Sequence, residues 1–412
     1  LEDFYEINMT MGHHTADEVI MQVADRMQEI VEEWNQIDVA SAMLYRIGED
    51  EFIIIMEDID GEASVIQSGE ALLARMLEPF SVRETVFYLP ARAGFTLFPE
   101  DGKDSEALVQ NAQMASDDAK HQLKAAHKLQ RFHIRMAHSA RERMERIHAL
   151  RKATENQDLY LNFQPKVNTD TKTIIGMEAL IRWKPDGNTL LPPTSFIPLA
   201  EETGIIFDLG DLVLSKTCRQ ILAWQEIGII PPPIAINISP VQLTQYEFPH
   251  RFMRTLENYG IKTQQIIIEI TESVFLHERK MSAEILAQLQ KAGIRIHLDD
   301  FGTGYSSFSY LSDLPLDCVK IDRSFIQRCS SEEMLTQSDK TSDSNKPRQL
   351  NHRTILDGII TLAQGLHLDI IAEGVETPEQ VDVLNQLGCN TVQGYYYYRP
   401  MEAKDLTAIL KP

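Results

Sequence analysis

Short apolar runs separated by helical stretches fill the chain from about residue 158 onward. Eight such runs occur, and most of the segments between them are long enough to form a helix that connects parallel strands. Strands and helices alternating over about 250 residues predict a (β/α)8 barrel. The first two runs, at 159–167 and 174–183, are separated by only the six residues NTDTKT, too few for a helical crossover. They predict an antiparallel hairpin, so we expect an α/β fold with a modified TIM-type barrel that contains one antiparallel strand.

The first 125 residues show a mixed pattern of helices and strands. Apolar residues at helical spacing predict an amphipathic helix over 16–34, and two β-rich runs predict a hairpin over 40–57. No Gly or Pro occurs between 116 and 157, which predicts one long helix or two. We therefore predict three parts: an α+β domain over 1–125, a helical linker over 126–157 and the barrel over 158–412.

One segment of the barrel region is poorly suited to a folded core. Residues from about 328 to 352 are rich in Ser, Asp, Lys and Gln and have almost no large apolar side chains. Such a composition cannot bury enough apolar surface to order itself. We expect this segment to be an inserted, mobile loop between the sixth strand and its helix.

Composition and charge narrow the possible functions. The chain has 412 residues, which suits two or three domains, and its formal net charge is −22. A surface so negative repels polyphosphate backbones, so we expect no non-specific binding of nucleic acid. The four cysteines lack C-x-x-C spacing, which argues against a zinc site or a disulfide framework and fits a reducing compartment.

The start of the chain suggests a piece of a longer protein, because no initiator Met precedes Leu1. We find no signal peptide, and no apolar run approaches the ~20 residues that span a bilayer. We expect this fragment to be cytoplasmic. Any sensor domain or inner-membrane anchor of the full-length protein would then lie upstream.

Carboxylate and amide side chains recur near the ends of the predicted barrel strands. Asp299 and Asp300 directly follow a buried run in the stretch IRIHLDDFGTGYSS. Taken alone, two aspartates before a glycine are typical of a solvated turn. In a barrel, however, the C-terminal strand ends converge on one mouth, where active sites lie. The other polar side chains expected at this mouth are Glu178, Asn237, Glu269, Lys320, Asp322, Glu373, Glu376 and Gln393.

The chemistry of these side chains favours a metal centre. Oxygen ligands without His or Cys suit Mg²⁺ or Mn²⁺ rather than zinc. Two such ions ~3.5–4 Å apart are a common arrangement for in-line attack on a phosphodiester. Metal ions would also compensate the repulsion between Asp299 and Asp300, and Lys320 would be placed to hydrogen-bond a nucleophilic water. The strand ends therefore predict a phosphodiesterase centre, with a simple turn as the alternative.

The motifs EALIRW, NIS, EITES, DDFGTGYSS, KIDRSF, AEGVET and QGYYYYRP, in this order, resemble the EAL-domain family of cyclic di-GMP phosphodiesterases. The resemblance covers nearly all of 158–412. It implies hydrolysis of cyclic di-GMP to linear pGpG with two Mg²⁺ or Mn²⁺ ions. It also implies a homodimer through this domain, in which Glu272 steadies the loop that follows DDFG.

The resemblance implies a role for each matching position. The residues that resemble ligands of the first ion are Glu178, Asn237, Glu269 and Asp299. Those that resemble ligands of the second ion are Asp299, Asp300 and Glu373, and we add Asp322 to the metal set. The candidate catalytic residues are Lys320, which resembles the residue that holds the attacking water, together with Glu373, Asp300 and Glu272. The residues that resemble substrate contacts are Gln164, Leu180, Arg182 and Gln393.

Residues 1–125 resemble a GGDEF domain, the fold of diguanylate cyclases, in the stretches FYEINMTMGHHTADEVI and RIGEDEF. The signature reads GEDEF, so Glu49 replaces a glycine that lies against the GTP phosphates in the family. A bulky anionic side chain there crowds and repels those phosphates.

Other positions of the GGDEF pattern are partly kept. Met9 and Ala16 depart from the family pattern, and the strand with the first metal-binding Asp would lie before Leu1. Val39 and Ala42 stand where the inhibitory RxxD pattern would be. The matching positions are Asn8, Asp17 and Lys120, so GTP is a candidate ligand of this domain.

Three functions are compatible with these motifs. We favour an active cyclic di-GMP phosphodiesterase with a degenerate GGDEF domain as its regulator. A non-catalytic cyclic di-GMP receptor is the main alternative, but receptors of this family typically lose metal-binding carboxylates that this chain retains. A bifunctional cyclase and phosphodiesterase is disfavoured by the altered GGDEF turn.

Overall fold

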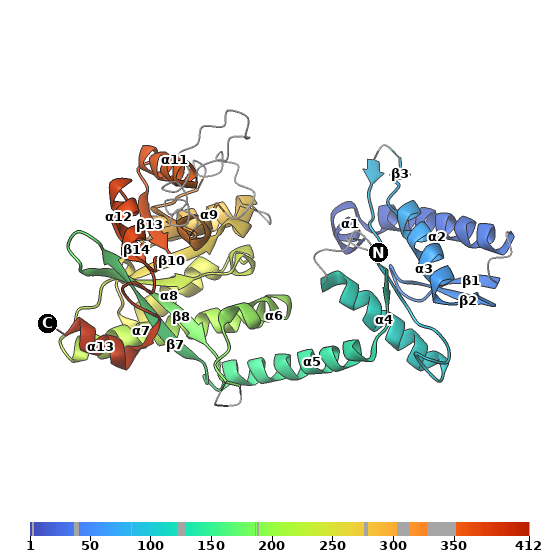
Figure 1. Cartoon of the computed structure of the whole chain (residues 1–412), viewed down its shortest axis with the longest axis horizontal. Helices are drawn as coiled ribbons and strands as arrows, with labels where there is room; N and C mark the ends of the chain where they lie inside the picture. The colour runs from blue at the N-terminus through green and yellow to red at the C-terminus, as the bar shows by residue number, and fades with distance from the viewer. Residues whose placement is uncertain are drawn as a thin grey trace, which may run out of the picture. The chain divides into compact units, whose positions relative to one another are not determined.

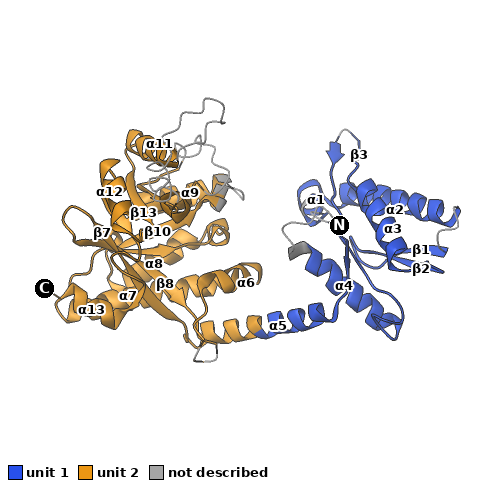
Figure 2. Ribbon diagram, in the orientation of Figure 1, with its two compact units in different colours: residues 1–145 blue, residues 146–412 orange. Residues whose placement is uncertain are grey.

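The computed structural model describes residues 1, 4–36, 41–83, 85–121, 129–185, 187, 189–275, 279–302, 314–327 and 352–411. The chain divides into two compact units, Leu1–Glu145 and Arg146–Pro412, which Figure 2 colours separately. This division falls within a helix, and the domain boundaries expected at 125 and 158 stay a prediction. Except for His352, the expected insertion over 328–352 lies outside the described residues.

The first unit has mixed α and β structure (Figure 1). Its elements are α1 (Phe4–Met11), α2 (His13–Gln36), β1 (Ser41–Arg46), β2 (Phe52–Glu57), α3 (Glu62–Met76), β3 (Phe80–Val82), β4 (Thr85–Phe87), β5 (Ala93–Phe95), α4 (Ser105–His121), β6 (Leu129–Arg131) and the first part of α5 (Ile134–Glu155), whose remainder belongs to the second unit. The predicted amphipathic helix corresponds to α2, which buries Val19, Val23 and Ile30 at helical spacing. The predicted hairpin is confirmed as the antiparallel pair β1–β2.

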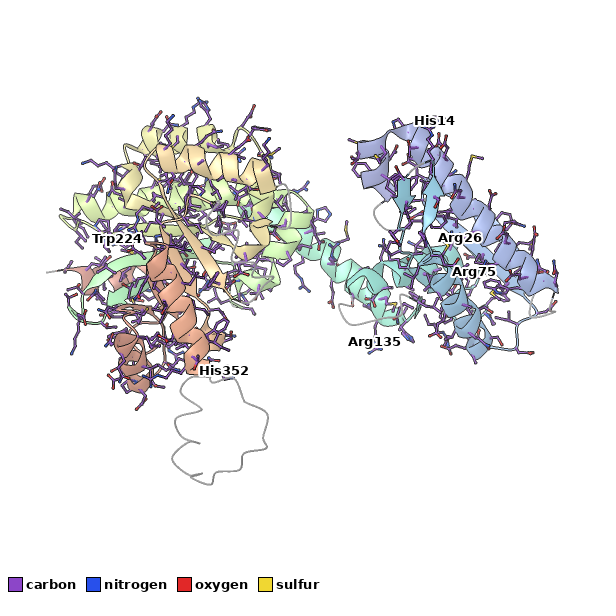
Figure 3. All side chains as sticks on the ribbon, turned by 90° about the horizontal axis from the view of Figure 1, so that it is seen from above. His14, Arg26, Arg75, Arg135, Trp224 and His352 are labelled. Atoms are coloured by element: carbon purple, nitrogen blue, oxygen red, sulfur yellow. The ribbon has the colours of Figure 1, made fainter. Side chains whose placement is uncertain are left out.

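Arg26 of α2 forms hydrogen bonds with the backbone at the C-terminal end of α3. Its guanidinium donates hydrogen bonds to the carbonyl oxygens of Arg75 (3.3 Å), Glu78 (2.6 Å) and Pro79 (2.9 Å). It also lies 3.8 Å above the ring of Phe80. Figure 3 labels Arg26 and Arg75 on these neighbouring helices. Carbonyls at a helix C-terminus lack intrahelical partners, so this one side chain satisfies groups that would otherwise need water.

A short strand divides the helical segment that the sequence predicts over 116–157. The strand β6 pairs in parallel with β5 before α5 begins at Ile134. Next to it, Phe132 packs with Ala115 and Met136 in a small buried cluster. The segment therefore contains two helices with a strand between them. A single continuous helix does not form because Leu129–Arg131 find strand partners that are distant in sequence.

The second unit is a closed barrel. Its strands are β7 (Tyr160–Asn168), β8 (Ile174–Arg182), β9 (Ile234–Asn237), β10 (Ile266–Thr271), β11 (Arg295–Phe301), β12 (Cys318–Ile321), β13 (Asp369–Glu373) and β14 (Thr391–Gln393). Neighbouring strands from β8 to β14 run parallel, whereas β7 pairs antiparallel with both β8 and β14 and closes the barrel. The predicted modified (β/α)8 barrel, with its one antiparallel strand, is therefore confirmed. A further strand, β15 (Met401–Glu402), pairs with β7.

The helices of this unit cover the outside of the barrel (Figure 1). They are α6 (Ile197–Glu202), α7 (Ile205–Glu226), α8 (Phe248–Tyr259), α9 (Arg279–Lys291), α11 (His352–Gly365), α12 (Pro378–Gln386) and α13 (Ala403–Leu410). Trp224 of α7, labelled in Figure 3, donates a 2.8 Å hydrogen bond from Nε1 to the hydroxyl of Thr407 in α13. None of the described helices is long and apolar enough to cross a membrane.

Side-chain alternation in the strands sorts apolar from polar residues. Ile236, Ile268 and Ile296 stand in register on adjacent strands and belong to the buried apolar core. The next residue of each strand is polar, and Glu269 pairs in register with Asn237 on one side. Because successive side chains of a strand point to opposite faces, the apolar set faces the helices and the polar set faces the barrel interior. The strands thereby line the interior with charged groups.

Candidate active site

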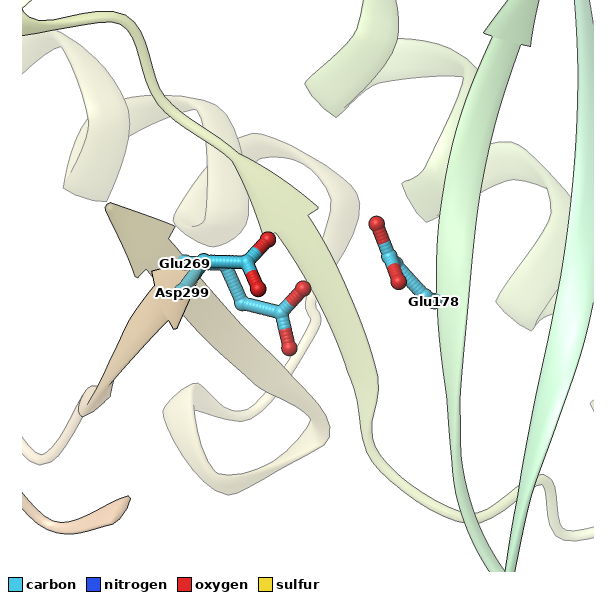
Figure 4. Close-up of side chains that lie close together, drawn as sticks. All are labelled: Glu178, Glu269 and Asp299. Carbon is cyan, nitrogen blue, oxygen red and sulfur yellow. The ribbon is translucent and has the colours of Figure 1, made fainter. Parts of the chain in front are cut away.

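Three buried carboxylates from three strands meet inside the barrel. Glu178 of β8, Glu269 of β10 and Asp299 of β11 each offer an oxygen, and these atoms lie within 4.8 Å of one another (Figure 4). A second group consists of Asp299, Asp300 and Glu373, with the same spacing. Asp299 belongs to both groups, so it joins them into one cluster.

An irregularity at the end of β11 brings the two adjacent aspartates to the same cluster. The register between β11 and β12 shifts between Leu298 and Phe301, and Asp300 has a φ of 52°. Neighbouring residues of a regular strand would face opposite sides, whereas a bulge re-aims one of them. Positive φ is uncommon outside glycine, although Asp tolerates it, and such positions often accompany functional sites. Asp299 is only 8% exposed, which a solvated turn would not explain.

Lys320 of β12 lies among four carboxylates and is completely buried. Its Nζ is 2.7 Å from Glu373 Oε1, 2.8 Å from Glu269 Oε2, 3.0 Å from Asp299 Oδ1 and 3.3 Å from Glu178 Oε2. Burial alone would lower the pKa of Lys320, but these carboxylates outweigh it and raise the pKa well above its usual value. Lys320 is therefore a positively charged hydrogen-bond donor at neutral pH.

One lysine does not balance the charge of the surrounding carboxylates. Burial raises the pKa of Asp299 well above its usual value, and the neighbouring Glu373 adds to this despite Lys320. Burial also raises the pKa of Glu373 to about 6, again with Lys320 opposing. These oxygens therefore retain unbalanced negative charge when ionised, which a divalent cation would offset. The donor set fits Mg²⁺ or Mn²⁺.

Asn237 and Gln393 both donate hydrogen bonds to the Glu178 carboxylate. Asn237 Nδ2 donates to Glu178 Oε1 at 2.6 Å, and Gln393 Nε2 donates to Glu178 Oε2 at 2.7 Å. Gln393 Nε2 also lies 3.2 Å from Gln164 Oε1. Asn237 and Gln393 thus hold the Glu178 carboxylate in place, and Gln164 adjoins it through Gln393.

Leu180 and Arg182 follow Glu178 at alternate positions of β8, so they share its face of the strand. Arg182 is partly buried, and its Nη1 donates to the carbonyl oxygen of Ile181 at 2.9 Å. Burial lowers the pKa of this guanidinium somewhat, with Glu178 opposing the shift. The side chain provides a positive group near the acidic cluster.

Three other residues singled out from the sequence belong to neither carboxylate group. Asp322 follows β12 and accepts a 2.9 Å hydrogen bond from the backbone N–H of Ser324, and it belongs to neither carboxylate group. Glu272 accepts a 2.7 Å hydrogen bond from the backbone N–H of Gly302, directly after β11. The backbone N–H of Glu376 donates to Gln380 Oε1 at 2.7 Å. The bond from Gly302 joins Glu272 to the residue after β11, and the steadying role expected for Glu272 stays a prediction.

Two buried residues of the interior escaped the sequence analysis, Lys166 and His297. The ammonium of Lys166 donates to Glu269 Oε1, and His297 Nδ1 lies 3.7 Å from the same oxygen. Burial would raise the pKa of Glu269, but Lys166 and Lys320 outweigh it and lower the pKa well below its usual value. The alternation of β7 contained a signal, because Lys166 lies two residues after Gln164, which was already placed at the site.

Comparisons with known proteins agree with this fold. The EAL domain model matches residues 147–400, and the diguanylate cyclase GGDEF domain model matches residues 1–126. The chain belongs to the EAL-domain family, with a GGDEF domain and an EAL domain in tandem.

Two relatives from Pseudomonas aeruginosa align with nearly the whole chain. The bifunctional diguanylate cyclase/cyclic di-GMP phosphodiesterase MucR is 35% identical over 99% of this chain and 56% of its own length. The cyclic di-GMP phosphodiesterase NbdA is 31% identical over 100% of this chain and 49% of its own length. A solved structure of the PaMucR phosphodiesterase in complex with c-di-GMP is 37% identical, covers 64% of this chain and 99% of that one, and gives a TM-score of 0.56. The chain thus spans about half the length of the curated relatives that it matches.

Proposed function

We propose that the barrel hydrolyses cyclic di-GMP to linear pGpG with two Mg²⁺ or Mn²⁺ ions, and that the GGDEF domain is a degenerate regulator. The observation that carries this proposal is the pair of carboxylate groups that share the buried Asp299. The family membership and the cyclic di-GMP phosphodiesterases among the relatives support the same activity.

The two carboxylate groups assign the proposed metal ligands to two ions. Ligands of one ion would be Glu178, Asn237, Glu269 and Asp299. Ligands of the other would be Asp299, Asp300 and Glu373, with Asp322 as a further candidate. When bound, such ions lower the pKa of a bound water and stabilise negative charge on a phosphoryl oxygen.

Lys320 would orient the attacking water and stabilise developing negative charge. Its raised pKa keeps Nζ protonated, so it serves as a hydrogen-bond donor and not as a general base. Its contacts with Asp299 and Glu373 fix the ammonium at the centre of the cluster. Such a preorganised donor needs little rearrangement as charge develops on the reacting phosphate.

The substrate would be held by the polar groups around the cluster. Arg182 offers a guanidinium to a phosphate, which matters because the chain as a whole is strongly negative. The other proposed contacts are Gln164, Leu180 and Gln393. The proposed assembly is a homodimer through the EAL domain, where the contact of Glu272 with Gly302 orders the start of a loop at the interface.

Incubation of the purified chain with cyclic di-GMP and Mg²⁺ or Mn²⁺ should give linear pGpG as the main product. The reaction should stop when a chelator removes the ions, because the carboxylates alone supply no electrophile. Chromatographic separation of the nucleotides measures the pGpG formed with the ions and in the presence of the chelator. Tight binding of cyclic di-GMP without turnover in the presence of either ion would instead support the receptor function.

The GGDEF domain should not make cyclic di-GMP from GTP. Glu49 is exposed in the turn between β1 and β2, where its charge would face the phosphates. Arg46 Nη2 donates to the carbonyl oxygen of Glu49 at 2.7 Å, and this hydrogen bond holds the backbone of the turn in place. The assay should use a longer chain that includes the preceding sequence, with Glu49→Gly as the comparison. Synthesis of cyclic di-GMP by the unaltered chain would show that the domain is an active cyclase.

A further inference from the structure

Glu269 is held between two buried lysines, one on each carboxylate oxygen. The ammonium of Lys166 donates to Oε1, whereas Lys320 Nζ donates to Oε2 at 2.8 Å. Lys166 is 2% exposed and Glu269 is 0% exposed. Lys320 already contacts the other carboxylates of the cluster, so Oε2 is the oxygen that faces them. Oε1 faces Lys166, whose ammonium reaches it from the antiparallel strand β7.

Two neighbours of Lys166, Gly176 and His297, help to define its contact with Glu269 Oε1. Lys166 pairs in register with Gly176 of β8, so no side chain of that neighbour competes for the space. His297 Nδ1 is 3.7 Å from Oε1, and neither of its ring nitrogens has a hydrogen-bond partner among the described residues.

We propose that Lys166 is a positioning residue of the metal centre. By holding Glu269 Oε1, it leaves Oε2 alone to face the shared carboxylate cluster, and its charge limits how strongly that cluster attracts a divalent cation. The consequence for catalysis rests on the proposed function. The consequence for cation binding does not, because it follows from the buried charges alone.

Removing the Lys166 charge should lower the stability of the metal-free protein and raise its affinity for a divalent cation. Without the ammonium, Glu269 Oε1 loses the hydrogen bond that it accepts from Lys166, and the surroundings of Glu269 become one unit more negative. Breaking a buried ion pair by removing one member destabilises the fold because it leaves a buried charge uncompensated. The same extra negative charge attracts a divalent cation more strongly. A lysine that only fills space predicts no gain in cation binding.

The test uses the 412-residue chain, with Lys166→Met compared with Lys291→Met. Lys291 is exposed at the end of α9 and serves as the matched control. Calorimetric titration with Mn²⁺ alone should give a Kd about tenfold lower for Lys166→Met than for wild type. In a chelator, its melting temperature should fall by roughly 5–10 °C. Lys291→Met should change neither quantity.

A double-mutant cycle with Glu269→Gln shows whether Lys166 acts through Glu269. In the Glu269→Gln protein, Lys166 is a buried cation without its carboxylate, so adding Lys166→Met should raise the melting temperature. If the Lys166→Met protein is too unstable to purify, recovery of folded protein in the double variant gives the same support. The proposal would be overturned if Lys166→Met lowered the melting temperature equally in the wild-type and Glu269→Gln proteins. An unchanged Kd for Mn²⁺ would overturn it as well.

These measurements are independent of hydrolysis. A wild-type chain that binds Mn²⁺ but does not hydrolyse cyclic di-GMP would contradict the proposed function, and the Lys166 results would still decide the present proposal. Where hydrolysis is observed, the Mn²⁺-saturated Lys166→Met protein should have a lower kcat, because Glu269 is no longer held in one orientation. An unchanged kcat together with an unchanged Kd would show that Lys166 is not a positioning residue.

Discussion

Replacing Asp299 by Asn should lower cyclic di-GMP hydrolysis by several orders of magnitude. Asp299 belongs to both carboxylate groups, so the substitution removes one unit of negative charge from both proposed ion sites at nearly constant volume. Activation of water and stabilisation of the phosphoryl oxygens both depend on the ions in a two-metal centre. The measurement is the initial rate of pGpG formation at saturating Mg²⁺ or Mn²⁺.

The Asp299→Asn protein should nevertheless fold. Burial and neighbouring carboxylates raise the pKa of Asp299, which means that its ionised form is unfavourable in the metal-free fold. Asparagine keeps an Oδ1 acceptor for the backbone N–H of Asp300, which donates at 2.9 Å in wild type. The melting temperature in a chelator should therefore be unchanged or higher, whereas the increase caused by Mn²⁺ should be smaller. Binding of cyclic di-GMP should persist in part through Arg182.

A matched control is Asp357→Asn, because Asp357 is exposed on α11 and belongs to neither carboxylate group. This control should hydrolyse at the wild-type rate. If Asp299→Asn also hydrolysed at nearly the wild-type rate, the paired aspartates would be only a turn, since Asn serves turns as well as Asp.

Replacing Lys320 by Met should abolish turnover and also destabilise the metal-free protein. Lys320 is fully buried and balances four carboxylates, so its removal leaves clustered charges without a partner. The loss of one member of a buried ion pair typically costs about 3–5 kcal/mol in the free energy of unfolding. Denaturant titration in a chelator measures this cost, and a nucleotide assay measures turnover.

Mn²⁺ should restore much of the stability of the Lys320→Met protein, but it should not restore activity. The ion replaces the missing positive charge, whereas the hydrogen bond from Nζ to the attacking water is not replaced. Lys291→Met is again the control for a lost lysine. Full activity of Lys320→Met in Mn²⁺ would show that the ammonium has no part in the reaction.

The barrel was predictable because its signals are local and repeated. The six-residue connection between the first two runs excluded a helical crossover and therefore fixed β7 as antiparallel. The rule that strand ends meet at one mouth then predicts from the sequence that Glu178, Glu269 and Asp299 lie together, as the structure shows. In contrast, β6 is three residues long and depends on a partner strand in β5, which no periodicity reveals.

Side-chain direction at the strand ends was the least predictable feature. Asp322 lies just beyond β12, where alternation no longer applies, and its carboxylate turns to the backbone of Ser324. Asp300 reaches the cluster only because the register shifts at the end of β11. Lys166 was overlooked because a lone lysine in a strand is usually solvated, and only its pairing with Glu269 shows otherwise.

The most direct test of the metal centre is anomalous diffraction from a crystal of the chain grown with Mn²⁺. Two anomalous peaks should lie within the carboxylate cluster, and the carboxylate of Asp299 should contact both. The absence of a peak there at saturating Mn²⁺, or peaks only at other acidic groups, would contradict the assignment of this cluster as the hydrolytic centre.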